Sequence, residues 1–396
     1  MKFFFSLIAL LCINIAVAQT NAIIGVVIDA EKSLPLPNSN VFISNTNKGI
    51  ITDNAGKFAL YNVPEGKSLE LVVSCIGYET FTYTFSSTQL PLNLKISLNN
   101  KIVEMNNLVI IPVDTRGWEK WGRTFMNNFL GESENGYGCE IENSRNIKFR
   151  YNKKEGVLEA SSDEMLIIRN YKLGYFIKYQ LENFVLDFKK NRVSYSGYPL
   201  FQEMEPNQPL DADYRRRRLK AYNGSIMHFI RSLYADKLKE EGFKVMRMVR
   251  TLVDDTIIND RRSAHKLYVV DSAGNKQATR NIIRKTYRDK IDTILLSRDS
   301  IVFSGADNIK DILSFNNFLY VQYMLEKEPA EYRSTYRLEP KRDFQLSKFT
   351  ILNDDKIILI APGGYYYPGL ELFVEGYLAW EKIGDLLPMD YMPAKD

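Results

Sequence analysis

The sequence has very few of the residues that metal and thiol chemistry require. It contains 2 histidines and 3 cysteines in 396 residues. A zinc peptidase binds its metal through histidine and carboxylate ligands at fixed spacing. His228 is followed by Phe229-Ile230-Arg231, which does not fit the His-x-x-Glu pattern of such enzymes. The sequence therefore excludes a zinc peptidase, and we expect no metal ion and no cofactor.

Other catalytic motifs are also missing. The chain contains no Gly-x-Ser-x-Gly elbow, P-loop or dinucleotide-binding fingerprint. Gly224-Ser225 is better explained as a helix cap, and His228 as a core or surface histidine than as the partner of Cys139 in a catalytic pair. We therefore predict no catalytic residue. A pair of carboxylates that hydrolyses glycosides leaves no sequence signature, so a hydrolase of that kind stays an alternative.

No excess of either charge is present. The 52 lysines and arginines nearly balance 48 aspartates and glutamates, for a net charge of +4. Without a strong positive field we expect no nucleic-acid partner. Arg215 to Arg218 form the densest basic run, but four consecutive helical residues point around a full turn. They predict a solvated, ion-paired helix, with binding of an anionic lipid or polysaccharide as the alternative.

Long apolar runs are absent except at the N-terminus. Lys2 precedes the apolar run from Phe3 to Val17, which ends in the small residues around Ala18. The run is shorter than the roughly 20 residues that span a bilayer, and its end fits signal-peptidase cleavage between Ala18 and Gln19. Residues 1–18 are predicted to be a signal peptide, with an uncleaved anchor as the alternative. We expect an exported protein that is periplasmic or associated with the outer membrane.

Removal of the signal peptide leaves two cysteines, Cys75 and Cys139. An oxidising compartment would allow them to pair. Two buried thiols are the favoured interpretation, because Cys75 continues the inward-facing alternation of its predicted strand. The sequence leaves the pairing open.

Residues 19–100 have the pattern of an all-β sandwich. Short apolar runs alternate with turn signals, and the Asp53 to Phe58 segment with Gly56 is typical of a tight hairpin. Aromatic residues make up 12% of the chain and favour strands. Leu69 to Ser74 forms a nearly continuous apolar run, which indicates a buried strand.

This segment resembles the carboxypeptidase-regulatory-like domain. The resemblance depends on Gly25-Val26-Val27-Ile28-Asp29, Pro35-Leu36-Pro37, Val41-Phe42-Ile43, Thr52-Asp53 with Gly56 and Phe58, and Ser74 with Ile76-Gly77-Tyr78-Glu79. It implies a seven-stranded sandwich of the prealbumin (transthyretin) type. The domain occurs in many exported Bacteroidetes proteins.

A linker is predicted over residues 101–113, followed by a larger α+β domain over residues 114–396 that is rich in strand. A helix is expected over 114–130, because Trp118, Trp121, Phe125 and Phe129 recur at helical spacing. Alternation from Tyr175 to Glu182 predicts a half-buried strand. Asp211 and Ser225 are expected to cap two further helices, the second over 225–241. The fold class is thus mainly β with α+β character.

A second resemblance extends into this region. It depends on Trp121 and Phe125, Phe129-Leu130-Gly131, Cys139, Ile141 and Asn143, Leu173-Gly174-Tyr175, and Ala221-Tyr222, Gly224-Ser225 and His228-Phe229. These residues resemble a group of exported Bacteroidetes proteins that carry the same N-terminal domain and have no characterised function. The resemblance implies no catalytic chemistry.

A loop framed by glycine and proline, Ala361 to Gly369, is the best candidate for ligand binding. Its Tyr365, Tyr366 and Tyr367 could stack on a sugar or a peptide. A turn whose rings pack against neighbouring strands is the alternative.

Together these features predict a non-enzymatic protein of the cell envelope that binds or scaffolds a partner. The expected partner is an envelope protein or a polysaccharide, and a peripheral association with a membrane is also compatible. A small outer-membrane β-barrel is one alternative, although the two expected helices would interrupt it. The carboxylate-dependent hydrolase is the other, and it requires an acid-lined cleft in the C-terminal domain.

Overall fold

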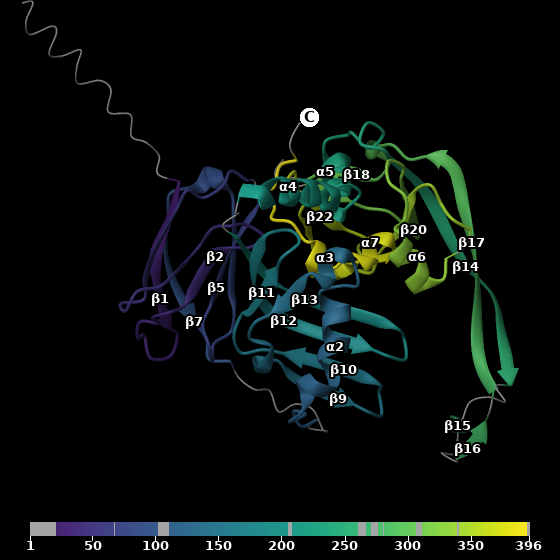
Figure 1. Cartoon of the computed structure of the whole chain (residues 1–396), viewed down its shortest axis with the longest axis horizontal. Helices are drawn as coiled ribbons and strands as arrows, with labels where there is room; N and C mark the ends of the chain where they lie inside the picture. The colour runs from purple at the N-terminus through teal and green to yellow at the C-terminus, as the bar shows by residue number, and fades with distance from the viewer. Residues whose placement is uncertain are drawn as a thin grey trace, which may run out of the picture.

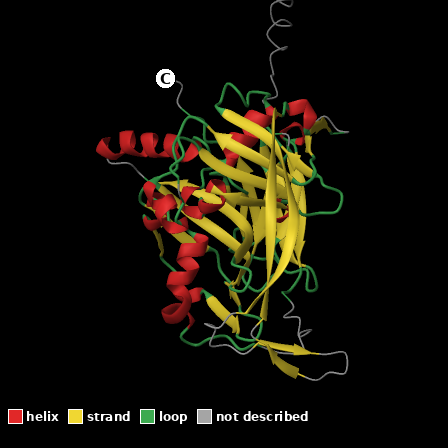
Figure 2. Ribbon diagram, turned by 90° about the vertical axis from the view of Figure 1, so that its right-hand side faces the viewer, coloured by secondary structure: helices red, strands yellow, loops and turns green. Residues whose placement is uncertain are grey.

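The computed structural model shows a strand-rich α+β protein in three units (Figure 1). It describes residues 21–66, 68–101, 111–204, 208–259, 267–270, 276–279, 281–305, 311–338 and 340–393. The predicted signal peptide, with Ala18 and Gln19, and most of the predicted linker lie outside the described residues. Figure 2 shows that the strands stack in layers, with most of the helices along one side.

The first unit is the predicted sandwich. Its seven strands form one sheet in the order β4-β1-β7 and a second in the order β3-β2-β5-β6. The strands are β1 (Ala22–Asp29), β2 (Asn40–Ile43), β3 (Gly49–Ile51), β4 (Lys57–Tyr61), β5 (Leu69–Ser74), β6 (Phe81–Phe85) and β7 (Leu92–Leu98). Inward-facing residues such as Val27, Val41 and Leu71 form the core between the sheets. The seven-stranded fold is therefore confirmed.

The aspartates of this unit stabilise turns. Asp53 Oδ1 accepts hydrogen bonds from the backbone N–H groups of Ala55 and Lys57. Asp29 accepts from the backbone of Lys32 and from the Tyr78 hydroxyl, and these bonds lower the pKa of Asp29. Both aspartates therefore accept hydrogen bonds from donors of the protein itself, as expected for turn aspartates.

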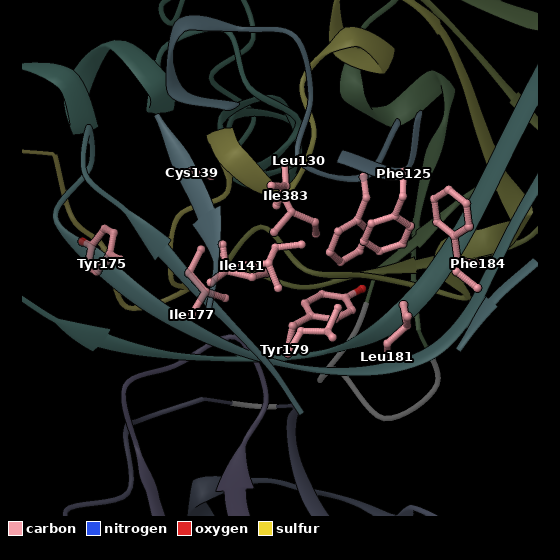
Figure 3. Close-up of a cluster of buried hydrophobic side chains, with 14 of the residues drawn as sticks. Phe125, Leu130, Cys139, Ile141, Tyr175, Ile177, Tyr179, Leu181, Phe184 and Ile383 are labelled. Atoms are coloured by element: carbon pink, nitrogen blue, oxygen red, sulfur yellow. The ribbon is translucent and has the colours of Figure 1, made fainter. Parts of the chain in front are cut away.

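The second unit packs a helix on a six-stranded sheet. Helix α2 (Gly117–Phe129) lies over a sheet in the order β8-β11-β12-β10-β9, and β13 pairs with the other edge of β12. Phe125 and Phe129 are fully buried, as their spacing predicts, and contact the rings of Phe184 and Tyr179 of β12, respectively. Figure 3 shows Phe125 on the same side of the sheet as Tyr179 and Phe184. The elements are α3 (Glu134–Tyr137), β8 (Cys139–Ile141), β9 (Lys148–Asn152), β10 (Val157–Ser161), β11 (Leu166–Asn170), β12 (Tyr175–Asp187), β13 (Arg192–Glu203) and α4 (Gln208–Tyr222).

The third unit has its own hydrophobic core, around Phe229, Val321 and Phe349. Its sheets run in the orders β17-β14-β20-β21-β24 and β18-β19-β22-β23, and β15 and β16 form a separate pair. The elements are α5 (Ile226–Tyr234), β14 (Phe243–Asn259), β15 (Leu267–Val270), β16 (Lys276–Thr279), β17 (Asn281–Leu295), β18 (Val302–Ser304), β19 (Asp311–Leu313), β20 (Phe318–Tyr323), α6 (Ala330–Tyr336), β21 (Gln345–Ile351), β22 (Ile358–Ile360), β23 (Tyr366–Tyr367), β24 (Leu372–Gly376) and α7 (Tyr377–Trp380).

Two helix boundaries differ from the prediction. Helix α4 begins at Gln208, so Asp211 lies inside it and is not its cap. Ser225 caps α5 as predicted, because its Oγ accepts the N–H of His228. This helix nevertheless ends at Tyr234 instead of residue 241. Asp236 adopts a φ of 56°, a left-handed conformation that aspartate tolerates and that ends the helix.

The sandwich is docked on the second unit. Sheet β3-β2-β5-β6 turns its outer face to β12 and β13, and Phe42 and Val72 pack there against Tyr198 and Leu200. The loop after β2 continues this contact with the backbone. Asn45 N–H donates to Pro199 O over 2.7 Å, and Phe201 N–H donates to the carbonyl of the residue after Asn45 over 2.8 Å. The two units therefore form one continuous packed structure (Figure 1).

Both remaining cysteines are free thiols. Cys139 is buried, and its Sγ donates to Asn135 O over 3.3 Å. Cys75 is half-buried at the end of β5 and contacts the rim of the sandwich core. In the part of the chain that the structure describes, no helix is long and apolar enough to cross a membrane.

Candidate functional site

A cavity of about 400 Å³ lies where the second and third units meet. Three stretches that are distant in the sequence line it. They are the start of β13, the start of α5, and the chain from residue 366 to 387 that contains β24 and α7. Small-molecule sites commonly lie between packed units and have volumes of roughly 300–1,000 Å³. The volume of this cavity lies within that range.

Most of the cavity wall is apolar. Leu372 and Val374 contribute from β24, Leu378 from α7, and Ile383 and Leu386 from the segment that follows. These side chains also belong to, or pack against, the cores of the two units. The wall is therefore held by the packing of the fold.

Three charged side chains follow one another at the end of α7 and line the same cavity: Glu381, Lys382 and Asp385. Each is half-buried. Asp385 is held by donors, since Ser133 Oγ lies 2.8 Å from its Oδ2 and Asn135 Nδ2 lies 2.9 Å from its Oδ1. It thereby fixes α3 against the 3-10 turn Ile383–Asp385, and its role is structural.

Glu381 and Lys382 are different. Among the described residues neither side chain has a hydrogen-bond or ion-pair partner, and the two do not pair with each other. Burial raises the pKa of Glu381 well above its usual range, and the negative charges of Asp385 and Glu326 add to the effect. Burial lowers the pKa of Lys382 to about 8. The cavity thus presents an acid and a base whose charged forms lack protein counterions.

The lowered pKa of Lys382 predicts a pH-dependent stability. Between pH 8 and 10.5 the unfolded chain binds the extra proton, so the free energy of unfolding rises with pH. Below pH 8 both states are protonated and the burial penalty is fully present. From pH 7 to 10.5 we expect the wild type to gain about 2 kcal/mol over Lys382→Met, after allowance for partial exposure. Urea unfolding of both proteins measures the difference, and parallel pH curves would contradict the lowered pKa.

The structure separates the three tyrosines of the predicted binding loop. Tyr366 lines the cavity, and burial raises its pKa to about 12. Tyr365 lies away from the cavity, where burial and the charge of Glu70 on β5 raise its pKa. Tyr367 is exposed. Only one member of the predicted ligand-binding set therefore lies at the cavity.

His228 is a core histidine. Its Nδ1 accepts the N–H of Gly224 over 3.1 Å, so Nε2 carries the proton and donates to Glu241, also over 3.1 Å. The ring stacks on Tyr222, and burial lowers its pKa. Cys139 is not among the contacts of this histidine, so the two do not form a catalytic pair. His265 lies outside the described residues.

Arg216 and Arg218 of the arginine run on α4 form ion pairs. Arg216 pairs with Asp213, and Arg218 pairs with Glu203 while its guanidinium stacks over the Tyr175 ring at 4.0 Å. Arg216 thus pairs with a residue of α4 itself, whereas Arg218 pairs with a residue of β13, as expected for two side chains on different sides of one helix.

The sequence patterns did not indicate Glu381, Lys382 or Asp385 as site residues. The only available signal was their position, since three charged residues interrupt the apolar stretch from Tyr377 to Leu387. Charges within an apolar stretch are usual at a solvated helix end, so the pattern alone did not indicate a cavity.

Comparison with known proteins shows that the first unit is similar to a known family of domains. Residues 23–110 match the family model of the CarboxypepD_reg-like domain. The sandwich is therefore similar to the CarboxypepD_reg-like domain. The match continues past residue 100, where the sequence predicted its end. A search of curated proteins finds no match to the chain.

Two solved structures show similarity to larger parts of the chain. One is a protein of unknown function from Bacteroides fragilis NCTC 9343, provisionally described as membrane-associated. It is 10% identical over 88% of this chain and 98% of its own, with a TM-score of 0.17. The other is a 9R-lipoxygenase from Cyanothece PCC8801, 12% identical over 56% of this chain and 49% of its own, with a TM-score of 0.16. The chain thus spans about half of the lipoxygenase, and neither likeness bears on function.

Proposed function

We propose that this chain is a non-enzymatic binding protein of the cell envelope that holds a small molecule in the cavity between its second and third units. The CarboxypepD_reg-like domain acts as a docked scaffold that stiffens the second unit from its outer face. The predicted signal peptide supports an envelope location.

The observation that carries the proposal is the composition of the cavity. An apolar wall surrounds Glu381 and Lys382, two ionisable side chains without partners in the described structure. Buried charges are costly unless they are compensated, and evolution of a purely structural junction would favour apolar side chains there. A bound molecule that supplies the missing partners accounts for their presence.

Native mass spectrometry of protein purified from its own envelope tests the proposal. We expect the wild type to carry a small molecule that denaturation releases, and Ala379→Trp, which places an indole in the cavity wall, to lack it. Arg123→Trp on the exposed face of α2 is the matched control and should retain the molecule. A wild-type mass equal to that of the bare polypeptide would contradict the proposed function.

The carboxylate-dependent hydrolase is a second candidate, because Glu381 and Asp385 line the same cavity. The raised pKa of Glu381 would keep this carboxyl protonated near neutral pH, as a general acid requires. Asp385, however, already accepts hydrogen bonds on both oxygens and is poorly placed to activate water. If the released molecule is cleaved when it is returned to the wild type, and not by Glu381→Gln, the hydrolase replaces the binding protein.

A further inference from the structure

We infer that the molecule bound in the cavity is a small zwitterion with apolar side chains, of the kind represented by a short apolar peptide with both termini free. This inference rests on the proposed binding function and specifies the chemistry of its ligand.

Two ionisable side chains of the cavity indicate the charge of the ligand. Glu381 and Lys382 both line the cavity, and neither side chain has a hydrogen-bond or ion-pair partner among the described residues. A ligand that carries only a cation would leave the ammonium of Lys382 uncompensated. A ligand that carries only an anion would leave Glu381 without a partner. A ligand that carries both charges satisfies both side chains, so zwitterionic chemistry is the complement of this site.

The apolar surface around these two side chains indicates the rest of the ligand. Leu372, Val374 and Leu378 line the cavity with apolar side chains that belong to, or pack against, the core of the third unit. Apolar contact with side chains of the ligand removes this surface from water. A volume of about 400 Å³ is at the small end of ligand sites, which suits an amino acid or a peptide of two residues rather than a polymer.

Arg192 is the other cation that lines the cavity. Its guanidinium lies over the Phe373 ring at 4.8 Å, and the residue is exposed. Solvent screens an exposed charge of this kind, whereas a half-buried amine is screened less. We therefore assign the ligand carboxylate to Lys382 and not to Arg192.

Isothermal titration calorimetry with leucyl-leucine and its three capped forms tests the inference. The probes are the free dipeptide, the N-acetyl form, the C-terminal amide, and the form with both caps. All four share the same side chains, so differences in affinity report on the termini alone. We expect each cap to weaken binding to the wild type at least about tenfold, because each removes the partner of one half-buried ionisable side chain.

Two variants assign the termini to residues. Glu381→Gln should weaken binding of the free dipeptide yet leave the N-acetyl form unaffected, and Lys382→Met should do the same for the C-terminal amide. Such non-additivity identifies direct contact and is not expected from a loss of stability. Glu240→Gln and Lys239→Met, exposed neighbours in the turn before β14, are the matched controls and should bind like the wild type.

The outcomes separate the inference from the function on which it rests. Equal binding of the free and the doubly capped dipeptide would overturn the zwitterion and keep the binding function. Tighter binding of either singly capped form than of the free dipeptide would also overturn it, in favour of a ligand with one charge. No binding of any probe to a protein that does carry a small molecule from the envelope would overturn the inference alone. No binding together with a bare polypeptide mass would remove both.

Discussion

Replacing Arg231 by methionine is expected to lower the free energy of unfolding by about 3–4 kcal/mol, because its guanidinium donates hydrogen bonds to three backbone carbonyls. Its Nε donates to Gly363 O over 3.1 Å, its Nη1 to Tyr391 O over 2.9 Å and its Nη2 to Met389 O over 2.8 Å. Hydrogen bonds to a charged group contribute about 1.5–3 kcal/mol each, and part of that is recovered when water reaches the freed carbonyls.

The loss of stability should extend beyond α5, the helix that carries Arg231. Gly363 belongs to the tyrosine loop that places Tyr366 at the cavity. Met389 donates its own N–H to Asn45 O of the sandwich over 2.6 Å. Arg231 therefore connects α5 to the cavity and, through the C-terminal segment, to the docked domain.

Urea unfolding compares Arg231→Met with Arg231→Lys and Arg123→Met. Lysine keeps the charge but cannot span three carbonyls with one planar fork, so an intermediate loss is expected. Arg123 lies exposed on α2, and its replacement should change the free energy of unfolding by less than about 0.5 kcal/mol. Equal stabilities of Arg231→Met and Arg123→Met would show that the three bonds contribute nothing.

Local sequence patterns predicted the elements of this fold well. The alternation of Ile177 and Tyr179 with Lys178 places the first two on the core of the second unit, as the structure confirms. The spacing of Phe125 and Phe129 predicted the buried face of α2 for the same reason. Periodicity reports which side of an element is buried, and it does so whatever the element packs against.

The same property explains what the patterns missed. Leu69 to Ser74 predicted a buried strand, and β5 is indeed buried on both faces. One face contacts the partner sheet of the sandwich and the other contacts the second unit, where Val72 lies. An apolar run of this kind indicates two-sided burial without naming the second partner. Val72 is the one apolar residue on the outward face of β5, between Glu70 and Ser74, and it marks the point where the sandwich docks.

The cavity could not be predicted, because no segment forms it alone. Ser194, Met227 and Glu381 come from three different elements and meet only when the second and third units pack together. A single-residue signal at Glu381 or Lys382 looks the same whether the side chain faces water or a cavity. Only the three-dimensional arrangement shows that these two side chains lack partners.

Phe42→Ala is expected to weaken docking of the sandwich by about 3–5 kcal/mol, the usual cost of removing a fully buried phenyl ring. Phe42 points out of the sandwich and packs, with Val72, against Tyr198 and Leu200 of β13. The other contacts are the smaller Val72 side chain, backbone hydrogen bonds of the loop after β2 and one exposed hydrogen bond from Thr80 to Glu182. Loss of the ring, the largest buried side chain of the interface, should therefore release the interface before either unit unfolds.

Hydrogen exchange at the amides of Asn45 and Phe201 measures this opening, because both donate across the interface. Their protection should fall at least about 100-fold in Phe42→Ala, since 1.4 kcal/mol corresponds to a factor of ten. Val41→Ala is the matched control, because the neighbouring side chain points into the core of the sandwich. Val41→Ala should lower the protection of amides within the sandwich core more than it lowers the protection of the Asn45 and Phe201 amides. If both variants affect Asn45 and Phe201 equally, the sandwich does not undock as a unit, and its release is coupled to its own unfolding.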